Sequence, residues 1–317
     1  MKEFSVILLL YNSTKESVRR TLASILCQEK VDWELILSDD GSSNNCLQEA
    51  EEYLLEKHYS NYKVKRHPQN VGTVQNIADA MELVEGKYVK CIGAGDLFFE
   101  RFTLKTVYDY MEKDDDASMC FGKMQAYSEK DSRLKLSPIS CPPDILAFKK
   151  KNIKRIQQNI IKNNGFISGA SMFYRSDKFK LYLESLLGVV TYCEDLLQII
   201  LLLNNERIIY LDDGLIYYEM GTGISTNTNI GNSIRMKHDF EEFWNMIIKK
   251  YPENSLLKSG RNLYHRECIP EKRKRQLQVI IFNPGYVFML LRTFFQKKIY
   301  EVNDNGMLQE IVGEENN

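Results

Sequence analysis

The sequence lacks the signatures of several common protein classes. No GxGxxG follows a predicted strand and no P-loop is present, so a glycine-loop cradle for a nucleotide is not supported. There is no run of 18 or more uninterrupted apolar residues, and the opening MKEFSVILLL is too short and too soon interrupted for a signal peptide. The four histidines, at positions 58, 67, 238 and 265, show no metal-ligand spacing.

Cysteine usage and net charge exclude further classes. The seven cysteines are odd in number and scattered without a CxxC pair, and several lie in apolar runs, which is typical of reduced core residues in a cytosolic protein. A formal net charge of -1 gives no global field that would attract nucleic acid. The 317 residues, 44% hydrophobic and 27% charged, indicate a soluble globular protein of one large or two ordinary domains.

The first hundred residues alternate between strand and helix patterns. Buried strands are predicted at 4–10, 33–38, 62–66 and 88–92. Helices follow the first three, the first of them opened by a capping box from Ser13 to Glu16, and another helix is expected over 103–111. This order predicts a doubly wound, Rossmann-like half domain.

Each strand ends in residues suited to binding a ligand. These are Tyr11-Asn12, Asp39-Asp40, Asn70-Val71-Gly72 and Gly93-Ala94-Gly95-Asp96. Open α/β sheets place ligands at the carboxyl ends of their strands. Without a glycine loop, the phosphates of a nucleotide would be neutralised by a metal ion held on carboxylates.

Five segments, in this order and spacing, resemble the family-2 glycosyltransferases: FSVILLLYN, the helix ending in SILCQ, ELILSDDGSS, NVGTVQN and GKYVKCIGAGD. The similarity is dense over roughly the first 100 residues and thinner over 165–226. It implies an inverting enzyme with a GT-A fold, which combines a Rossmann-like nucleotide-binding half with a mixed central sheet. A UDP-sugar is the expected donor.

The resemblance also implies which residues bind the nucleotide sugar. They are Leu9, Tyr11, Asn12, Asp39, Asp40, Asn70, Gly72, Asn76, Ala94, Gly95 and Asp96. Tyr11 would lie against the uracil ring and Asp39 would accept the base N–H. Simpler interpretations remain open: a tyrosine packed under a helix, and an Asx turn at Asp39.

The acidic motif departs from the family pattern. Of the usual Asp-x-Asp-Asp, only Asp96 is kept, because Gly93 and Gly95 replace the other carboxylates. Asp96 is therefore the expected ligand of Mg²⁺ or Mn²⁺, with phosphate oxygens and water completing the shell. The run from Asp114 to Asp116 is expected at the opposite, amino-terminal edge of the sheet.

The resemblance assigns catalysis to Glu194 and Asp195. Asp195 would be the general base that removes the proton of the acceptor hydroxyl, and Glu194 would orient the acceptor or Asp195. Simple capping of the apolar helix 196–203 is the alternative. Beyond a hairpin predicted from two strands, at 207–211 and 215–218, the segment 221–226 resembles the family's mobile loop.

The expected organisation has three parts: a nucleotide-sugar-binding half at 1–126, an acceptor and catalytic-base half at 127–230, and a C-terminal helical region at 231–317. Helices are predicted at 149–162, 234–250 and 271–298, a proline-containing loop at 137–143, and a mobile tail after Val302. The basic, apolar stretch 272–298 could rest on an anionic membrane, pack on its own domain or form a homo-oligomer contact.

These patterns predict transfer of a sugar to a hydroxyl on a glycan or lipid-linked sugar, in cell-surface polysaccharide synthesis. The enzyme would be cytoplasmic, with peripheral contact at the inner face of the membrane. Two alternatives remain open at this stage. One is a degenerate sugar-nucleotide-binding subunit without catalysis, suggested by Gly93 and Gly95. The other is a nucleotidyltransferase, although YNSTKES lacks the glycines of its phosphate loop.

Overall fold

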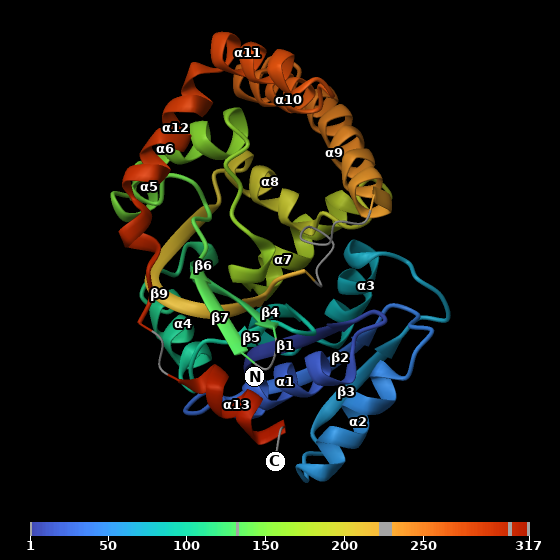
Figure 1. Cartoon of the computed structure of the whole chain (residues 1–317). Coiled ribbons are helices and arrows are strands. Elements are labelled where there is room, and N and C mark those ends of the chain that lie inside the picture. Colours follow the sequence, from blue (N-terminus) through green and yellow to red (C-terminus); the bar gives the residue numbers. More distant parts are fainter. Residues whose placement is uncertain (1, 131–132, 222–229, 304–305, 316–317) are drawn as a thin grey trace.

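A computed structural model describes residues 2–130, 133–221, 230–303 and 306–315. A mixed nine-stranded sheet in the order β3-β2-β1-β4-β8-β6-β9-β5, with β7 paired to β6, runs through the molecule and carries helices on both faces (Figure 1). The strands are β1 (Lys2–Leu10), β2 (Trp33–Asp39), β3 (Tyr62–Arg66), β4 (Gly86–Gly93), β5 (Leu97–Phe98), β6 (Ala117–Lys130), β7 (Arg133–Pro138), β8 (Met172–Arg175) and β9 (Arg207–Glu219).

The α-helices of the sheet domain are α1 (Lys15–Leu26), α2 (Cys46–Glu56), α3 (Thr73–Ala80), α4 (Thr103–Met111), α5 (Leu146–Lys149), α6 (Ile153–Gln157), α7 (Ser176–Leu183) and α8 (Leu197–Leu203). The C-terminal part adds α9 (Ile230–Lys250), α10 (Ser255–Glu267), α11 (Lys272–Phe282), α12 (Pro284–Phe295) and α13 (Met307–Glu315). Short 3₁₀ turns at Gly169–Ser171 and Glu194–Leu196 lie beside the site described below.

The predicted Rossmann-like half is confirmed. β1 pairs in parallel with β2 and β4, and β2 pairs in parallel with β3. Because the apolar side chains of β1 alternate, Ile7 faces the core under α3 while Val6 and Leu8 face the core under α1 and α2. The first helix is capped by Thr14, whose hydroxyl accepts from Ser17 N at 3.1 Å, rather than by Ser13.

The predicted hairpin at 207–218 is wrong. One continuous strand, β9, crosses this stretch in parallel with β6, with register shifts where Lys123 pairs with Gly214. Asp212 points outward and forms ion pairs with Lys123 (3.2 Å) and Lys149 (2.5 Å), so it does not turn the chain. The polar residues Asp212 to Gly214, whose sequence is typical of a turn, instead form an irregularity in the pairing of β9 with β6.

Two predicted elements before β8 also differ. The helix expected at 149–162 is interrupted, because Asn152 caps a new helix by accepting from Arg155 N at 3.0 Å, and it ends in a π-helical turn at Gln158–Lys162. Strand β7 takes up Ser137 and Pro138, which were expected in a loop; it lies on the outer side of β6, where a proline is tolerated.

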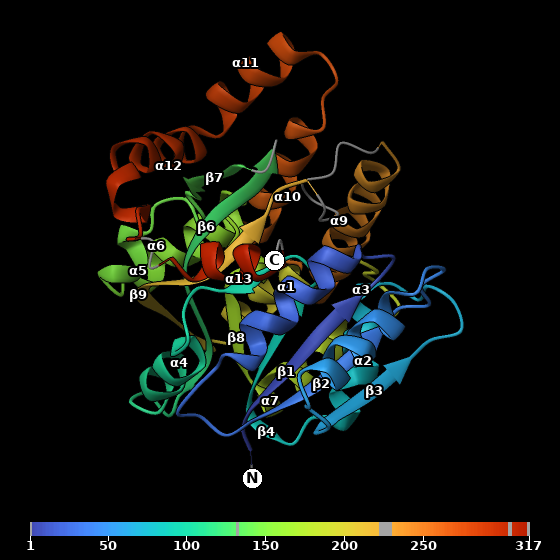
Figure 2. The same cartoon turned by 60° about the horizontal axis from the view of Figure 1, so that its bottom comes forward.

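The C-terminal region departs from expectation in two places. The helix predicted over 271–298 splits at Asn283, because Pro284 begins a second helix and cannot continue the first. The tail expected to be mobile forms α13, whose Met307, Leu308 and Ile311 are buried beside β5 and β9. Figure 2 shows α13 near α1, while α11 and α12 extend away from the sheet.

Candidate active site

The site begins where β1 and β4 end at the carboxyl edge of the sheet. A cavity of about 240 Å³ is lined there by four of the residues expected from sequence, Leu9, Asp96, Glu194 and Asp195, together with Gly93. Asp96 and the pair at 194–195 are separated by almost a hundred residues in sequence but line the same cavity. The fold therefore gathers the expected metal ligand and the expected base in one cavity.

The loop after β2 (40–45) and the loop after β3 (67–72) are held together beside this cavity, and we call the two loops the shelf. Asp40 holds the second loop, because its carboxylate accepts from Asn70 Nδ2 (2.8 Å), Val71 N (2.7 Å) and Gly72 N (3.1 Å). Burial nevertheless raises the pKa of Asp40 above its ordinary value. The Asp40 carboxylate is thus engaged in shaping the loops.

Asp39 differs from Asp40, because one of its two carboxylate oxygens accepts no hydrogen bond from the described residues. Asp39 is fully buried, and Oδ1 accepts from Ser42 N at 3.1 Å. Within the part of the chain that the structure describes, Oδ2 accepts no hydrogen bond, although Arg66 Nε forms an ion pair with it at 3.5 Å. A buried carboxylate oxygen that accepts no hydrogen bond is suited to accept an N–H from a ligand.

Two other side chains that were expected to bind the ligand already form hydrogen bonds within the protein. Asn12 accepts from Ser43 N at 2.8 Å, which ties the ends of β1 and β2 together. Asn76 is buried, with its amide oxygen accepting from Ser38 Oγ at 2.7 Å. Tyr11, in contrast, is 47% exposed beside these loops, as an aromatic platform for a flat base would be.

Gly72 brings the loop after β3 against the segment that precedes Glu194 and Asp195. Its φ of 89° is a backbone conformation that glycine adopts readily, and a Cβ at this position would overlap Thr191. Only glycine therefore allows the loop after β3 to lie this close to Thr191. Val74 N donates to Thr191 O at 3.0 Å, and Tyr192 OH donates to Asn70 Oδ1 at 3.4 Å. The segment leading into Glu194 is therefore fixed against the loop after β3.

Sequence reasoning missed Asp239, on α9. Its buried carboxylate accepts from three consecutive backbone N–H groups, those of Thr191 (3.1 Å), Tyr192 (2.6 Å) and Cys193 (3.1 Å). These bonds orient the start of the turn Glu194–Leu196. The only sequence signal was a single acidic residue in an amphipathic helix, which carries little information by itself.

Glu219, at the end of β9, was also missed. Its backbone N–H donates to Asp96 Oδ1 at 3.1 Å, and Ser17 Oγ donates to its carboxylate at 3.1 Å. A Cβ on Gly95 would overlap this carboxylate, and Gly95 has a φ of 107°. The side chain of Glu219 therefore fills the space in which a second carboxylate of the acidic motif would stand.

A buried lysine lies behind the cavity. Lys90, in the middle of β4, is fully buried, donates to Ala170 O (2.6 Å) and Met172 O (3.2 Å), and lies over the Phe173 ring. Burial lowers its pKa, while the charges of Asp96 and Glu194 oppose this shift. In the sequence, the only signal for Lys90 was the position of a lysine inside an otherwise apolar strand.

The three acids at the cavity have raised pKa values. Burial is the main cause for Asp96, Glu194 and Asp195, and the charge of Asp195 raises the pKa of Glu194 further. The Lys90 charge opposes the shift at Asp96 and at Glu194. Carboxylates that titrate near neutral pH inside a cavity are suited to acid–base catalysis.

Within the described residues, no group of three or more His, Cys, Asp or Glu side chains could hold a metal ion. Asp96 contributes one carboxylate to the cavity, which fits a divalent cation only when donor phosphates and water supply the other ligands. Residues 222–226 of the expected mobile loop lie outside the described residues.

The fold and the cavity define a class: a GT-A transferase sheet with acids gathered at the carboxyl ends of its strands. The family model described as glycosyl transferase family 2 matches residues 5–183, more than half of the chain, and the chain therefore belongs to this family. It is a glycosyltransferase that uses a nucleotide-sugar donor. The family match disfavours the two alternatives, a nucleotidyltransferase and a non-catalytic subunit.

Solved structures show the same fold at low identity. TarS from S. aureus, in complex with UDP-GlcNAc, is 19% identical with a TM-score of 0.57, over 100% of this chain and 92% of that chain. The mannosyltransferase PcManGT from Pyrobaculum calidifontis, in complex with GDP-Man and Mn²⁺, is 11% identical with a TM-score of 0.53, over 94% and 87%. A search of curated protein sequences found no match.

Proposed function

We propose that this enzyme is an inverting glycosyltransferase that moves a sugar from a UDP-sugar to a hydroxyl of a glycan or lipid-linked sugar. The observation that supports this best is the meeting of Asp96 with Glu194 and Asp195 in one cavity beside the shelf. The binding of UDP-GlcNAc by TarS, a structure of the same fold, agrees with the proposed donor. Synthesis of a cell-surface polysaccharide is the proposed setting.

The proposed donor site follows the carboxyl edge of the sheet. Tyr11 offers its exposed ring to the base, and Asp39 Oδ2 accepts the base N–H. Asn70 and Gly72 pass beneath the nucleotide, and Ala94 and Gly95 border the sugar and diphosphate. Asp96 would hold Mg²⁺ or Mn²⁺, and the ion would neutralise charge on the leaving diphosphate.

The proposed reaction is a single displacement. Asp195 takes the proton of the acceptor hydroxyl as its oxygen bonds to the anomeric carbon, and the bond from that carbon to the diphosphate oxygen breaks. One displacement inverts the anomeric configuration. Glu194 orients Asp195 and the acceptor, and Asp239 fixes the backbone that carries both acids.

The decisive experiment compares Asp195→Asn with the wild-type enzyme. We expect turnover to fall by about 10²–10⁴ because a general base contributes that much. UDP binding, measured by calorimetry, should change little, because Asp195 lies apart from the shelf. Asp116→Asn, an exposed carboxylate in the connection before β6, is the matched control. Unchanged turnover of Asp195→Asn would remove Asp195 from the mechanism.

Donor choice and location need tests of their own. Calorimetry with UDP and GDP, with and without Mn²⁺, reports the base and the metal requirement. We also propose a cytoplasmic enzyme that acts at the inner face of the membrane. The cytoplasmic location is supported by the seven cysteines, none of which forms a disulfide within the described residues. Fractionation of cells that express the full chain tests this location. A homo-oligomer remains a separate proposal, which sedimentation would test.

A further inference from the structure

Large apolar side chains are exposed on α11 and α12 far more densely than elsewhere. On α11 they are Leu277, Ile280, Ile281 and Phe282, and each is between 57% and 60% exposed. On α12 they are Phe288, Leu290, Leu291, Phe294 and Phe295, between 43% and 83% exposed. We call these nine residues the apolar face. Single exposed apolar residues are ordinary, but a contiguous group of this size marks a contact with another body.

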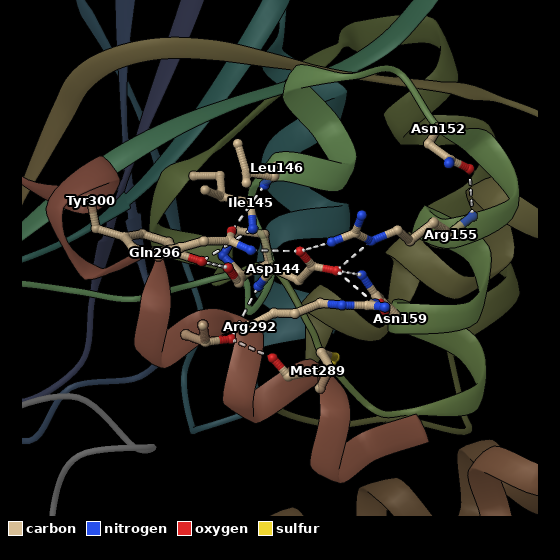
Figure 3. A network of polar contacts seen from close by, with 12 residues as sticks. Asp144, Ile145, Leu146, Asn152, Arg155, Asn159, Met289, Arg292, Gln296 and Tyr300 are labelled. Carbon is tan, nitrogen blue, oxygen red and sulfur yellow. Dashed lines mark hydrogen bonds and ion pairs between the residues drawn. The ribbon is translucent and has the colours of Figure 1, made fainter. Parts of the chain in front are cut away.

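The apolar face of α12 is turned away from the protein's own domain. The opposite side of α12 already packs on that domain through Asp144 (Figure 3). Asp144 N donates to Thr293 Oγ1 at 3.1 Å, Gln296 Nε2 donates to Asp144 Oδ1 at 2.9 Å, and Tyr300 OH donates to Pro142 O at 2.6 Å. Packing on its own domain therefore leaves the apolar face uncovered.

The segment that carries the apolar face is rich in positive charge, although Arg292 is paired with Asp144 at 3.6 Å on the side that packs on the domain. Residues 272–298 contain seven Lys or Arg side chains and no Asp or Glu, although the whole chain has a net charge of -1. Four of the cations are consecutive, from Lys272 to Arg275, and occupy the first turn of α11. Cations at a helix N-terminus oppose the helix dipole, so they do not stabilise the helix. In the described part of the chain, none of the four forms an ion pair with a carboxylate.

Neither α11 nor α12 is long enough by itself to cross a membrane. No single helix among the described residues is long and apolar enough to span a bilayer; α11 and α12 reach that length and composition only together, with a 98° bend between them. Each helix is about 17 Å long at 1.5 Å per residue, which is short of a hydrocarbon core of about 30 Å.

The cavity at the candidate active site and a second cavity beside α11 share one lining residue. Arg275 lines a cavity of about 640 Å³ together with Phe166, Phe240 and Tyr264. Met236 lines both this cavity and the one that holds Asp96 and Asp195. The second cavity therefore borders both the candidate active site, at Met236, and α11, at Arg275.

We propose that the apolar face and its cations dock this enzyme on an anionic lipid surface, with α11 and α12 lying in the plane of the membrane interface. The apolar side chains enter the boundary between headgroups and acyl chains while the cations contact anionic headgroups. The docking places the catalytic cavity beside the bilayer. That consequence rests on the proposed transfer to a lipid-linked acceptor, whereas the docking itself requires no catalysis.

Co-sedimentation of the full chain with lipid vesicles tests the docking. We expect binding to vesicles of phosphatidylcholine with 30% phosphatidylglycerol, weak binding to pure phosphatidylcholine, and loss of binding in high salt. Phe288→Ser with Phe295→Ser should weaken the binding through lost apolar contact. Lys272→Glu with Lys274→Glu should weaken it at least about tenfold, since a cation near an anionic surface contributes on the order of a fivefold gain in affinity.

The controls use exposed residues elsewhere on the molecule. Leu55→Ser with Leu181→Ser removes two exposed apolar side chains far from α11 and α12 in sequence, and Lys113→Glu reverses one exposed charge; both should bind vesicles like the wild type. Circular dichroism of every variant reports its folding, and UDP calorimetry reports the donor site separately.

Three outcomes would overturn the proposal. The first is absence of binding to anionic vesicles by a protein that binds UDP normally. The second is vesicle binding that the Phe288 and Lys272 variants leave unchanged. The third is an oligomer in sedimentation velocity that these same variants dissociate, which would assign the apolar face to a second copy of the chain. Vesicle binding without UDP binding would instead count against the proposed donor.

Discussion

The two missing carboxylates of the acidic motif differ in whether the fold has room for them. A Cβ on Gly93 meets nothing within 4 Å, whereas a Cβ on Gly95 would overlap the carboxylate of Glu219. Gly95 also has a φ of 107°, which side chains rarely adopt. We therefore expect Gly93→Asp to fold like the wild type and Gly95→Asp to be strongly destabilised.

The size of the effect follows from the contacts at Gly95. A non-glycine residue in a left-handed conformation costs about 1–2 kcal/mol. Displacement of Glu219 would break its hydrogen bond from Ser17 Oγ (3.1 Å), a loss of about 1 kcal/mol. The new carboxylate would also face Glu219 and Asp96, so the total loss should reach about 2–4 kcal/mol.

Urea unfolding followed by circular dichroism measures this difference, and Gly95→Ala separates the backbone strain from the added charge. Calorimetry with UDP and Mn²⁺ gives a second readout. Gly93→Asp should bind Mn²⁺ more tightly in the presence of UDP, because it adds an oxygen ligand next to Asp96. Equal stability of Gly93→Asp and Gly95→Asp would refute the reasoning.

Three further predictions concern charges. Asp195 has a pKa raised to about 6, so the rate of transfer should fall about tenfold per pH unit below that value, in a pH profile of kcat/KM. Lys90→Met should raise the pKa of Asp96 further and move Mn²⁺-dependent UDP binding to higher pH, whereas the surface variant Lys65→Met should not; identical pH dependence would contradict this. Asp144→Asn should lose about 3 kcal/mol in urea unfolding, because Arg155 keeps a charge without its partner. The pKa of Asp144 is lowered, so its contribution is present above the ordinary aspartate pKa and is lost as the pH falls through the folded-state value.

The sequence by itself determined the parallel, Rossmann-like half of the sheet and the residues that lie at its carboxyl edge. Buried parallel strands read as apolar runs, and their carboxyl ends must meet at one edge of the sheet. For that reason the positions of Asp39 and Asp96 in the sequence were enough to place them at the site. Glu194 and Asp195 could be assigned only through the family resemblance, and their presence in the same cavity agrees with it.

Contacts between distant segments were decided only by the tertiary structure. Strand β9 had the local pattern of a hairpin, but its long partner β6 keeps it extended, and this brings Glu219 to Gly95. Asp239 and Lys90 act through backbone groups that no sequence pattern marks. The tail after Val302 is polar in most positions, and its apolar side chains are buried in a cluster that contains residues of β5, β6 and β9. The periodicity of apolar residues shows which side of a segment is buried. Which other segment covers that side depends on the whole fold.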